Sequence, residues 1–268
     1  MSTPEKTRPA NPWWQRWQRQ WRAWRGAGEG KTHRVELVER DGQRFKRVIF
    51  DATDTANQCA KLLTELAPID RFVPLHRHRE GVVEVDFIDG PLARAGRDEA
   101  GLQAFFVDLY AGQGADQVSL EASNLMADLA ANLDFLVEHR LLGRDRRDAL
   151  WQAAQREAPY RLWLGADYID PVLKNFVKRA DQRMIAIDIE ALVGGLPLGS
   201  GLAKARLRWM RDEPSHLFSQ VKTAGGPDLS SQYRVVELAF LAGYFRQKII
   251  QKKPRHLHLP AFDRWLAG

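Results

Sequence analysis

The sequence has very little cysteine and no long apolar run. Its 268 residues include a single cysteine, Cys59, so the chain cannot close an internal disulfide, and this scarcity is typical of a reducing compartment. No stretch approaches the roughly 20 apolar residues that a membrane-spanning helix needs. The polar start, residues 1–12, lacks the apolar core of a signal peptide. These absences together predict a cytoplasmic protein.

Familiar nucleotide and nucleic-acid motifs are also missing. No zinc-finger or RNP signature is present, so we expect no nucleic-acid partner. A G-K-T triplet begins at Gly30, but a Walker loop needs another glycine five residues earlier, where Arg25 stands. The next segment, residues 35–38, alternates like a strand and not like the helix that such a loop opens. The triplet therefore does not predict a Walker loop.

The charge balance is basic. The net charge of +6 favours anionic partners, such as phosphorylated substrates or membrane surfaces. The alternative is a basic surface that faces only solvent.

Residues 1–25 combine a polar tail with a segment rich in tryptophan and arginine. Four tryptophans recur at steps of three or four residues, so a helix would line them along one face: Trp14, Trp17, Trp21 and Trp24. Tryptophan with arginine is typical of a helix that lies in a membrane interface. Alternatively, the tryptophan stripe docks on the protein's own core.

The patterns then divide the chain into two parts. Residues 26–92 predict strands with one helix: a hairpin around Asp41-Gly42, a helix in 54–66, and two strands flanking Gly81. Residues 93–268 predict mostly helices. The fold class is therefore α+β, with a small β-rich N-terminal lobe and a larger helical C-terminal lobe.

Chemistry-bearing residues gather within positions 168–192. Asp170 and Asn175 stand five positions apart, and Asp188 ends the short apolar strand pattern M-I-A-I-D. Carboxylate and amide oxygens are ligands that suit Mg²⁺, with nucleotide phosphates completing its shell. This segment resembles the catalytic part of the protein-kinase-like superfamily, in which D-x-x-x-x-N precedes a metal-binding aspartate. The I-D-I-E ending looks most like the aminoglycoside-phosphotransferase and lipopolysaccharide-core (Kdo/heptose) kinase branches.

The resemblance implies roles for these residues and a two-lobed fold that uses ATP and Mg²⁺. Asp170 would orient the acceptor hydroxyl and take its proton. Asn175 and Asp188 would coordinate Mg²⁺, with Glu190 as a further ligand. In the N-terminal lobe, the phosphate-binding lysine would be Lys46. Because a register slip of one residue flips the side chain, Arg47 is the alternative.

Two further elements of the nucleotide site are implied by the same resemblance. Gly26, Gly28 and Gly30 would cover the phosphates. The segment V-D-F-I-D-G-P-L resembles the hinge that holds adenine through backbone groups, with Asp86, Phe87 and Ile88 at its centre.

The sequence also departs from the superfamily pattern. Tyr168 stands where histidine is usual, and the helix expected to supply a glutamate for the lysine has Gln58 or Cys59 at the matching turn. A non-catalytic pseudokinase that binds a partner protein therefore stays open as a hypothesis.

The segment after Glu190 predicts the acceptor. No A-P-E triplet is present, which argues against protein substrates. The segment is instead glycine-rich and then basic, ending in Lys204, Arg206, Arg208 and Arg211. This favours an anionic saccharide or lipid-linked substrate of the lipopolysaccharide-core type, met at the cytoplasmic face of the membrane. A soluble kinase of the aminoglycoside type is the second enzyme hypothesis.

Overall fold

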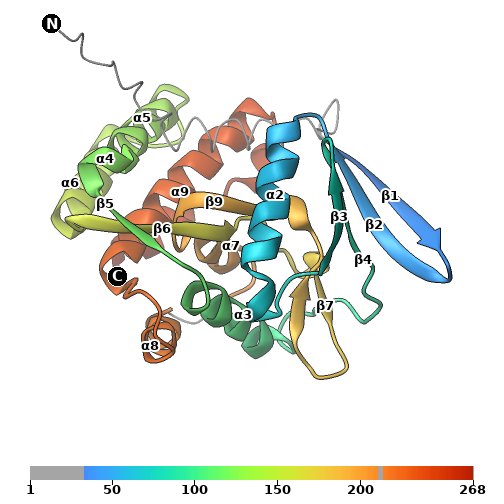
Figure 1. Cartoon of the computed structure of the whole chain (residues 1–268). Coiled ribbons are helices and arrows are strands. Elements are labelled where there is room, and N and C mark those ends of the chain that lie inside the picture. Colours follow the sequence, from blue (N-terminus) through green and yellow to red (C-terminus); the bar gives the residue numbers. More distant parts are fainter. Residues whose placement is uncertain (1–32, 211–213, 268) are drawn as a thin grey trace, which may run out of the picture.

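The computed structural model describes residues 33–210 and 214–267. The Trp/Arg segment within residues 1–25, together with Gly26, Gly28 and Gly30, lies outside the described residues. The rest forms an antiparallel sheet region followed by a mainly helical region, seen on opposite sides of Figure 1.

The N-terminal region is a four-stranded antiparallel sheet in the order β1-β2-β4-β3, with one helix packed on it. Its elements are β1 (His33–Arg40), β2 (Gln43–Phe50), α2 (Thr53–Glu65), the short helix η2 (Ala67–Ile69), β3 (Leu75–Arg79) and β4 (Val82–Asp86). The predicted hairpin around Asp41-Gly42 is present, and the two predicted strands flanking Gly81 form a second hairpin. Their turns, Asp41-Gly42 and Glu80-Gly81, have positive φ at both residues, which matches the twist of the flanking strands.

The register of β2 determines to which face of the sheet each of its side chains points. Lys46 lies opposite Leu37 of β1 and Val85 of β4, and its side chain points toward the residues just after β8. Arg47 points to the other face, because successive side chains alternate along a strand. There it binds Glu84 (Nε–Oε2 3.1 Å) and Glu36 (Nη1–Oε2 3.3 Å).

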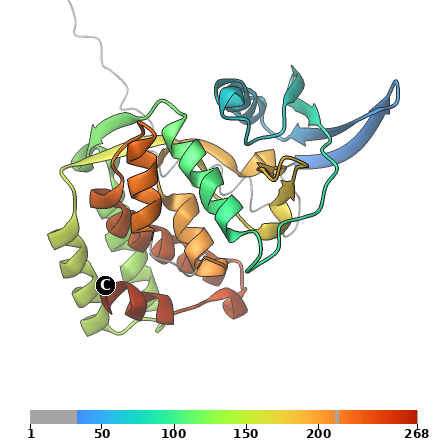
Figure 2. The same ribbon diagram turned by 90° about the horizontal axis from the view of Figure 1, so that it is seen from below.

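The C-terminal region is built around α9 (Ser230–Ile250), which is buried along most of its length. Leu238, Leu241 and Phe245 of α9 join one apolar cluster with residues of α5, α6 and α10. The helices of this region, besides α9, are α3 (Glu99–Ala111), α4 (Leu120–Ser123), α5 (Leu125–Glu138), α6 (Arg144–Glu157), α7 (Ser200–Arg208), α8 (Ser215–Thr223), α10 (Pro260–Ala267) and the short η5 (Pro254–His256). Figure 2 shows these helices gathered beside the sheet region.

A three-stranded antiparallel sheet within this region was not predicted from the sequence. It has the order β5-β6-β9 and consists of β5 (Asp116–Ser119), β6 (Arg161–Tyr168) and β9 (Leu192–Pro197). A two-stranded hairpin, β7 (Phe176–Lys178) and β8 (Met184–Ala186), stands between β6 and β9 in the chain, with the short helices η3 (Leu173–Asn175) and η4 (Ile189–Ala191) on either side of it. The hairpin includes the predicted M-I-A strand.

These strands set the position of the predicted catalytic segment. Asp170 comes just after the end of β6, Asn175 immediately precedes β7, and Asp188 comes just after β8. The antiparallel pairing of Phe176 with Ala186 therefore brings the two loops together at one end of the hairpin. No helix in the described part of the chain is long and apolar enough to cross a membrane.

Candidate functional site

Two of the three predicted magnesium-ligating residues, Asn175 and Asp188, contact each other. The Asn175 amide Nδ2 donates to Asp188 Oδ2 at 3.2 Å and to the Asp170 carbonyl at 2.9 Å. One amide thus joins the segment after β6 to the segment after β8. Burial, together with the nearby Glu190 carboxylate, raises the pKa of the Asp188 carboxyl. Keeping this carboxylate charged away from water costs free energy, and a bound cation would offset that cost.

Lys46 reaches across from the sheet region to the same place. Its Nζ donates to the Ile187 carbonyl at 3.0 Å and lies 3.4 Å from Asp188 Oδ1 and 3.2 Å from Glu190 Oε2. The superfamily pattern led us to expect the lysine's acidic partner in α2, where Gln58 and Cys59 stand. Here the partner comes from η4 instead.

Glu190 lies between a histidine and a lysine. Its Oε1 lies 3.2 Å from His33 Nε2, while its other oxygen faces Lys46. The Cys59 thiol of α2 donates to the Ile189 carbonyl at 3.6 Å, so α2 packs on this segment without contributing a charge. Sequence analysis assigned Glu190 to the metal, and that role stays a prediction. Its contact with Lys46 was missed because residues 144 positions apart give no local signal.

The donor set suits Mg²⁺ that is also bound by phosphates. Within the described ranges, no group of three or more His, Cys, Asp or Glu side chains is arranged to hold a metal. Asn175 and Asp188 offer an amide and a carboxylate, and Mg²⁺ commonly takes one or two such ligands and completes its shell with water and phosphate oxygens.

An apolar pocket adjoins Lys46. Its volume is about 280 Å³, and it is lined by Val35, Glu36, Leu37, Lys46, Val73, Asp86, Phe87, Ile88 and Ile187. The three predicted hinge residues therefore line the same pocket as Lys46. Two of their amides are engaged locally, since Asp86 donates to the Pro74 carbonyl and Phe87 to the Arg44 carbonyl.

Asp170, the predicted catalytic base, contacts a buried lysine. Its Oδ1 accepts a hydrogen bond from Lys204 Nζ, on α7. Only 3% of Lys204 is exposed, and burial lowers the pKa of its ammonium group although the Asp170 charge opposes this. Sequence analysis placed Lys204 in a basic rim. The structure instead buries it against the predicted base.

A second aspartate fixes the backbone around this loop. Asp167 is fully buried and accepts hydrogen bonds from the amides of Tyr168, Gly199 and Gly201 and from the Tyr110 hydroxyl. Burial raises its pKa to about 6, against the effect of these donors. Asp167 therefore ties the end of β6 to the start of α7. Asp167 was not predicted from the sequence, although it stands only three residues before Asp170.

Aromatic packing and one hydrogen bond to the backbone also fix the segment around Asp170. The ring of Tyr168 packs edge-on against Phe72, Phe105 and Phe176, at centroid distances of 6.0, 5.6 and 5.4 Å. In this chain the tyrosine at the usual histidine position is thus a core residue. The Trp209 indole donates to the Pro171 carbonyl at 2.6 Å and so anchors the loop just after Asp170.

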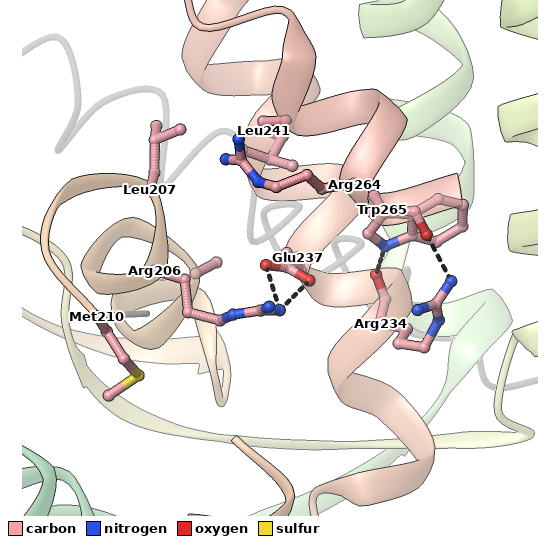
Figure 3. Close-up of a pocket in the computed structure, with 10 residues that line it drawn as sticks. Arg206, Leu207, Met210, Arg234, Glu237, Leu241, Arg264 and Trp265 are labelled. Carbon is pink, nitrogen blue, oxygen red and sulfur yellow. Dashed lines mark hydrogen bonds and ion pairs between the residues drawn. The ribbon is translucent and has the colours of Figure 1, made fainter. Parts of the chain in front are cut away.

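A separate cavity of about 320 Å³ lies between α7, α9 and α10 (Figure 3). Its charged residues are already engaged. Arg206 binds both carboxylate oxygens of Glu237, and Arg234 donates to the Trp265 carbonyl at 2.7 Å. None of the residues predicted for catalysis lines this cavity, so we assign it no part in the chemistry.

Comparison with known proteins finds similarity in structure only. No protein-family model matches the chain, and neither does any curated protein sequence. Among solved structures, a macrolide 2'-phosphotransferase type I superposes with a TM-score of 0.54 at 15% identity, covering 90% of this chain and 89% of that chain. The choline kinase LicA from Streptococcus pneumoniae gives a TM-score of 0.59 at 11% identity, covering 89% and 90%.

A third similar structure is a thermostable mutant of aminoglycoside phosphotransferase APH(4)-Ia in ternary complex with AMP-PNP and hygromycin B. Its TM-score is 0.57 at 13% identity, and the alignment covers 89% of this chain and 91% of that chain. Such low identities support a conclusion about the fold and not about the activity. The chain has the two-lobed protein-kinase-like fold that these phosphotransferases share.

Proposed function

We propose that the protein transfers the γ-phosphoryl group of ATP to a hydroxyl group of a saccharide. The observation that carries this proposal is that Lys46, at the wall of an apolar pocket, contacts Asp188. Asn175 joins Asp188 to the backbone of Asp170, so the four residues lie close together. Phosphoryl transfer depends almost entirely on positioning and electrostatic stabilisation, and these four side chains supply both.

In this proposal the apolar pocket holds the adenine ring. Val35, Leu37 and Ile187 would pack on its faces, and the backbone near Ile88 would meet its polar edge. Lys46, at the pocket wall, would bind the phosphates as a point charge, held in place by Glu190. The nucleotide-bound neighbours, with AMP-PNP in the APH(4)-Ia complex and AMP in LicA, support this use of the fold.

Asn175 and Asp188 would hold Mg²⁺, which neutralises developing phosphate charge when it is bound. On the acceptor side, Asp170 would accept the hydroxyl proton through the oxygen that Lys204 does not engage. The hydroxyl oxygen then forms a bond to the γ-phosphorus, the bond to the β-phosphate oxygen breaks, and ADP leaves. Lys204, by binding Oδ1, fixes the orientation of the carboxylate for this step.

The Lys46–Glu190 ion pair argues against the hypothesis of a non-catalytic pseudokinase. That hypothesis rested on the missing acidic partner in α2, and the described residues provide a partner from another element. We therefore favour an active enzyme.

The saccharide we propose is of the lipopolysaccharide-core type. The exposed Arg208 of α7 supports an anionic acceptor, whereas an aminoglycoside would be repelled there. Contact with the cytoplasmic membrane face is proposed through the Trp/Arg segment. Deleting residues 1–25 should reduce partition into anionic vesicles, and unchanged partition would remove the membrane part of the proposal.

The function is tested by incubating the full chain with ATP, Mg²⁺ and a panel of saccharides, and by detecting phosphorylated sugars by mass spectrometry. Asp170→Asn should abolish the product while leaving ATP binding intact. Asp148→Asn, an exposed aspartate of α6 paired with Arg147, serves as the matched control. Product formation that survives Asp170→Asn would overturn the assignment of the base.

A further inference from the structure

Basic side chains surround the ring of Tyr244, next to Asp170. They come from three elements, of which α9 and η5 follow each other in the chain: Lys204 and Arg208 on α7, Lys248 on α9, and His256 on η5. We call these four residues and Tyr244 the Tyr244 cluster. It extends the proposed catalytic site outward from the catalytic base.

The ring of Tyr244 organises the cluster. Lys248 Nζ lies 4.9 Å and Lys204 Nζ 5.9 Å from the ring centroid, and the Arg208 guanidinium carbon lies 5.8 Å from it. Arg208 Nη2 also donates to the Tyr244 hydroxyl at 2.6 Å and lies 3.4 Å from His256 Nδ1. An aromatic face attracts cations, so one ring holds three of them near each other.

The cluster carries more positive than negative charge. The carboxylate of Asp170 binds one of its cations, Lys204. Lys248 is only 8% exposed, and its Nζ bonds a neutral partner, Gln251 Oε1, at 3.2 Å. Burial, followed by the charges of Lys204, Lys253 and Arg208, lowers the pKa of Lys248 to about 8.

The excess of positive charge in the cluster also affects the pKa of His256. Burial lowers its pKa, and the charges of Arg208 and Lys248 lower it further, as do those of Arg255 and Lys253. Cations crowded where water is scarce repel one another, and a bound anion relieves this repulsion. Such a cluster in a protein is therefore a candidate binding site.

One cation of the cluster faces solvent. Arg208 is exposed, whereas Lys204 is buried against Asp170. A ligand that approaches from solvent would meet Arg208 first and the proposed base last. This order fits an acceptor whose anionic group stays near Arg208 and Lys248 while its hydroxyl reaches Asp170.

We propose that Arg208, Lys248 and His256 form a subsite for an anionic group, phosphate or carboxylate, on the acceptor. This inference rests on the proposed phosphotransferase function and specifies its substrate class. It separates this chain from neighbours named for aminoglycoside or choline acceptors. Guanidinium and ammonium donors suit either anion, and bidentate binding by Arg208 would orient it.

The subsite is tested first without ATP, so that the result does not depend on catalysis. Glucose 6-phosphate, glucuronate and glucose are titrated into the full chain by calorimetry. We expect saturable binding of one or both anionic sugars in the millimolar range or tighter, and none of glucose. Preference for the phosphate or for the carboxylate identifies which anion the acceptor carries.

Arg208→Gln and Lys248→Gln should each weaken the binding of the preferred anionic sugar by about tenfold, the usual effect of losing one charged hydrogen bond. Lys222→Gln removes one charge from an exposed pair on α8 and should leave binding unchanged. Equal binding of glucose, absence of binding by both anionic sugars, or insensitivity to both subsite substitutions would overturn the proposal.

A second readout separates the subsite from the nucleotide site. The stabilisation of the protein by ATP with Mg²⁺ should be the same in Arg208→Gln as in the wild type. If the substitution instead weakens ATP binding by tenfold, the cluster binds the nucleotide and the acceptor proposal is wrong. If ATP binds neither protein while anionic sugars bind as expected, the proposed function fails and the anion subsite stands.

Discussion

Lys46 and Glu190 form an ion pair, with Nζ and Oε2 3.2 Å apart, although 144 positions separate them in the sequence. The lysine belongs to β2 and the glutamate to η4, two residues after Asp188. The pair thus links the sheet region directly to the segment that carries the predicted metal ligands. Glu190 thus supplies the acidic partner for the lysine that α2 does not provide.

The first prediction concerns this pair. Lys46→Met should lower kcat by about 10²-fold or more, because one preorganised charge on the transferring phosphate is lost. Glu190→Gln keeps the shape but weakens the hold on Lys46, so we expect a smaller loss of about tenfold. Steady-state kinetics with the best acceptor measure both. Glu65→Gln, at the exposed end of α2, is the control, and a loss there as large as in Glu190→Gln would contradict our account.

The second prediction concerns the contact between α7 and β6. A Cβ atom at Gly201 would lie 2.2 Å from the Tyr168 carbonyl oxygen and 2.6 Å from Asp167 Oδ1. Gly201→Ala must therefore displace the backbone two residues before Asp170, and we expect a destabilisation of about 1–3 kcal/mol. Urea unfolding measures it.

Gly114→Ala is the matched substitution, because a Cβ atom there meets nothing within 4 Å. Its free energy of unfolding should stay within about 0.5 kcal/mol of the wild type. If the two variants were equally stable, the close approach at Gly201 would not be a constraint.

The third prediction is a pH dependence. Burial raises the pKa of Asp128, on α5, to about 7, although Arg246 opposes this. The usual aspartate value of about 3.9 applies when the chain is unfolded. Below that pH the carboxyl is protonated in both the folded and the unfolded protein, so it does not lower the free energy of unfolding. As the pH rises toward 7, the unfolded chain ionises first, so the folded state loses stability.

Asp128→Asn should remove this penalty. The melting temperature of the variant relative to the wild type should therefore be higher at pH 8 than at pH 5. Thermal unfolding at the two pH values measures the difference. A variant whose relative stability falls between pH 5 and pH 8 would show that the native carboxylate is stabilised by its surroundings.

The fourth prediction concerns the anchor of the catalytic loop. Trp209→Phe loses the bond to the Pro171 carbonyl and leaves that oxygen buried, which should cost about 1–3 kcal/mol of stability. Trp151→Phe, on α6, removes an indole that is only partly buried and should cost less. Denaturant unfolding compares the two, and an equal cost would mean that the Pro171 bond contributes nothing specific.

The local elements of the sheet region could be predicted because their signals are local. Asp41-Gly42 and Gly81 are turn residues next to short apolar or alternating runs, so the first hairpin and the two strands flanking Gly81 were expected. The segment Met184–Ala186 was recognised as a strand because it is a short apolar run that ends at Asp188. The order of Asp170, Asn175 and Asp188 in the sequence predicted their convergence.

The features that sequence analysis missed depend on distant pairing. The sheet formed by β5, β6 and β9 joins segments up to about 80 residues apart, and each strand alone is short. Whether Lys46 or Arg47 faces the site depended on a register that only pairing with Val85 or Glu84 decides. The Tyr244 cluster needs α7 and α9 side by side, which no periodicity in either helix predicts.

The central claim is a nucleotide site that depends on Mg²⁺, and thermal unfolding with ATP tests it most directly. A ligand that binds only the folded state raises the melting temperature by mass action. We predict that ATP with Mg²⁺ stabilises the wild type more than ATP with EDTA, and that Asp188→Asn loses this difference. Stabilisation that is absent, or that is indifferent to both Mg²⁺ and Asp188→Asn, would contradict the account.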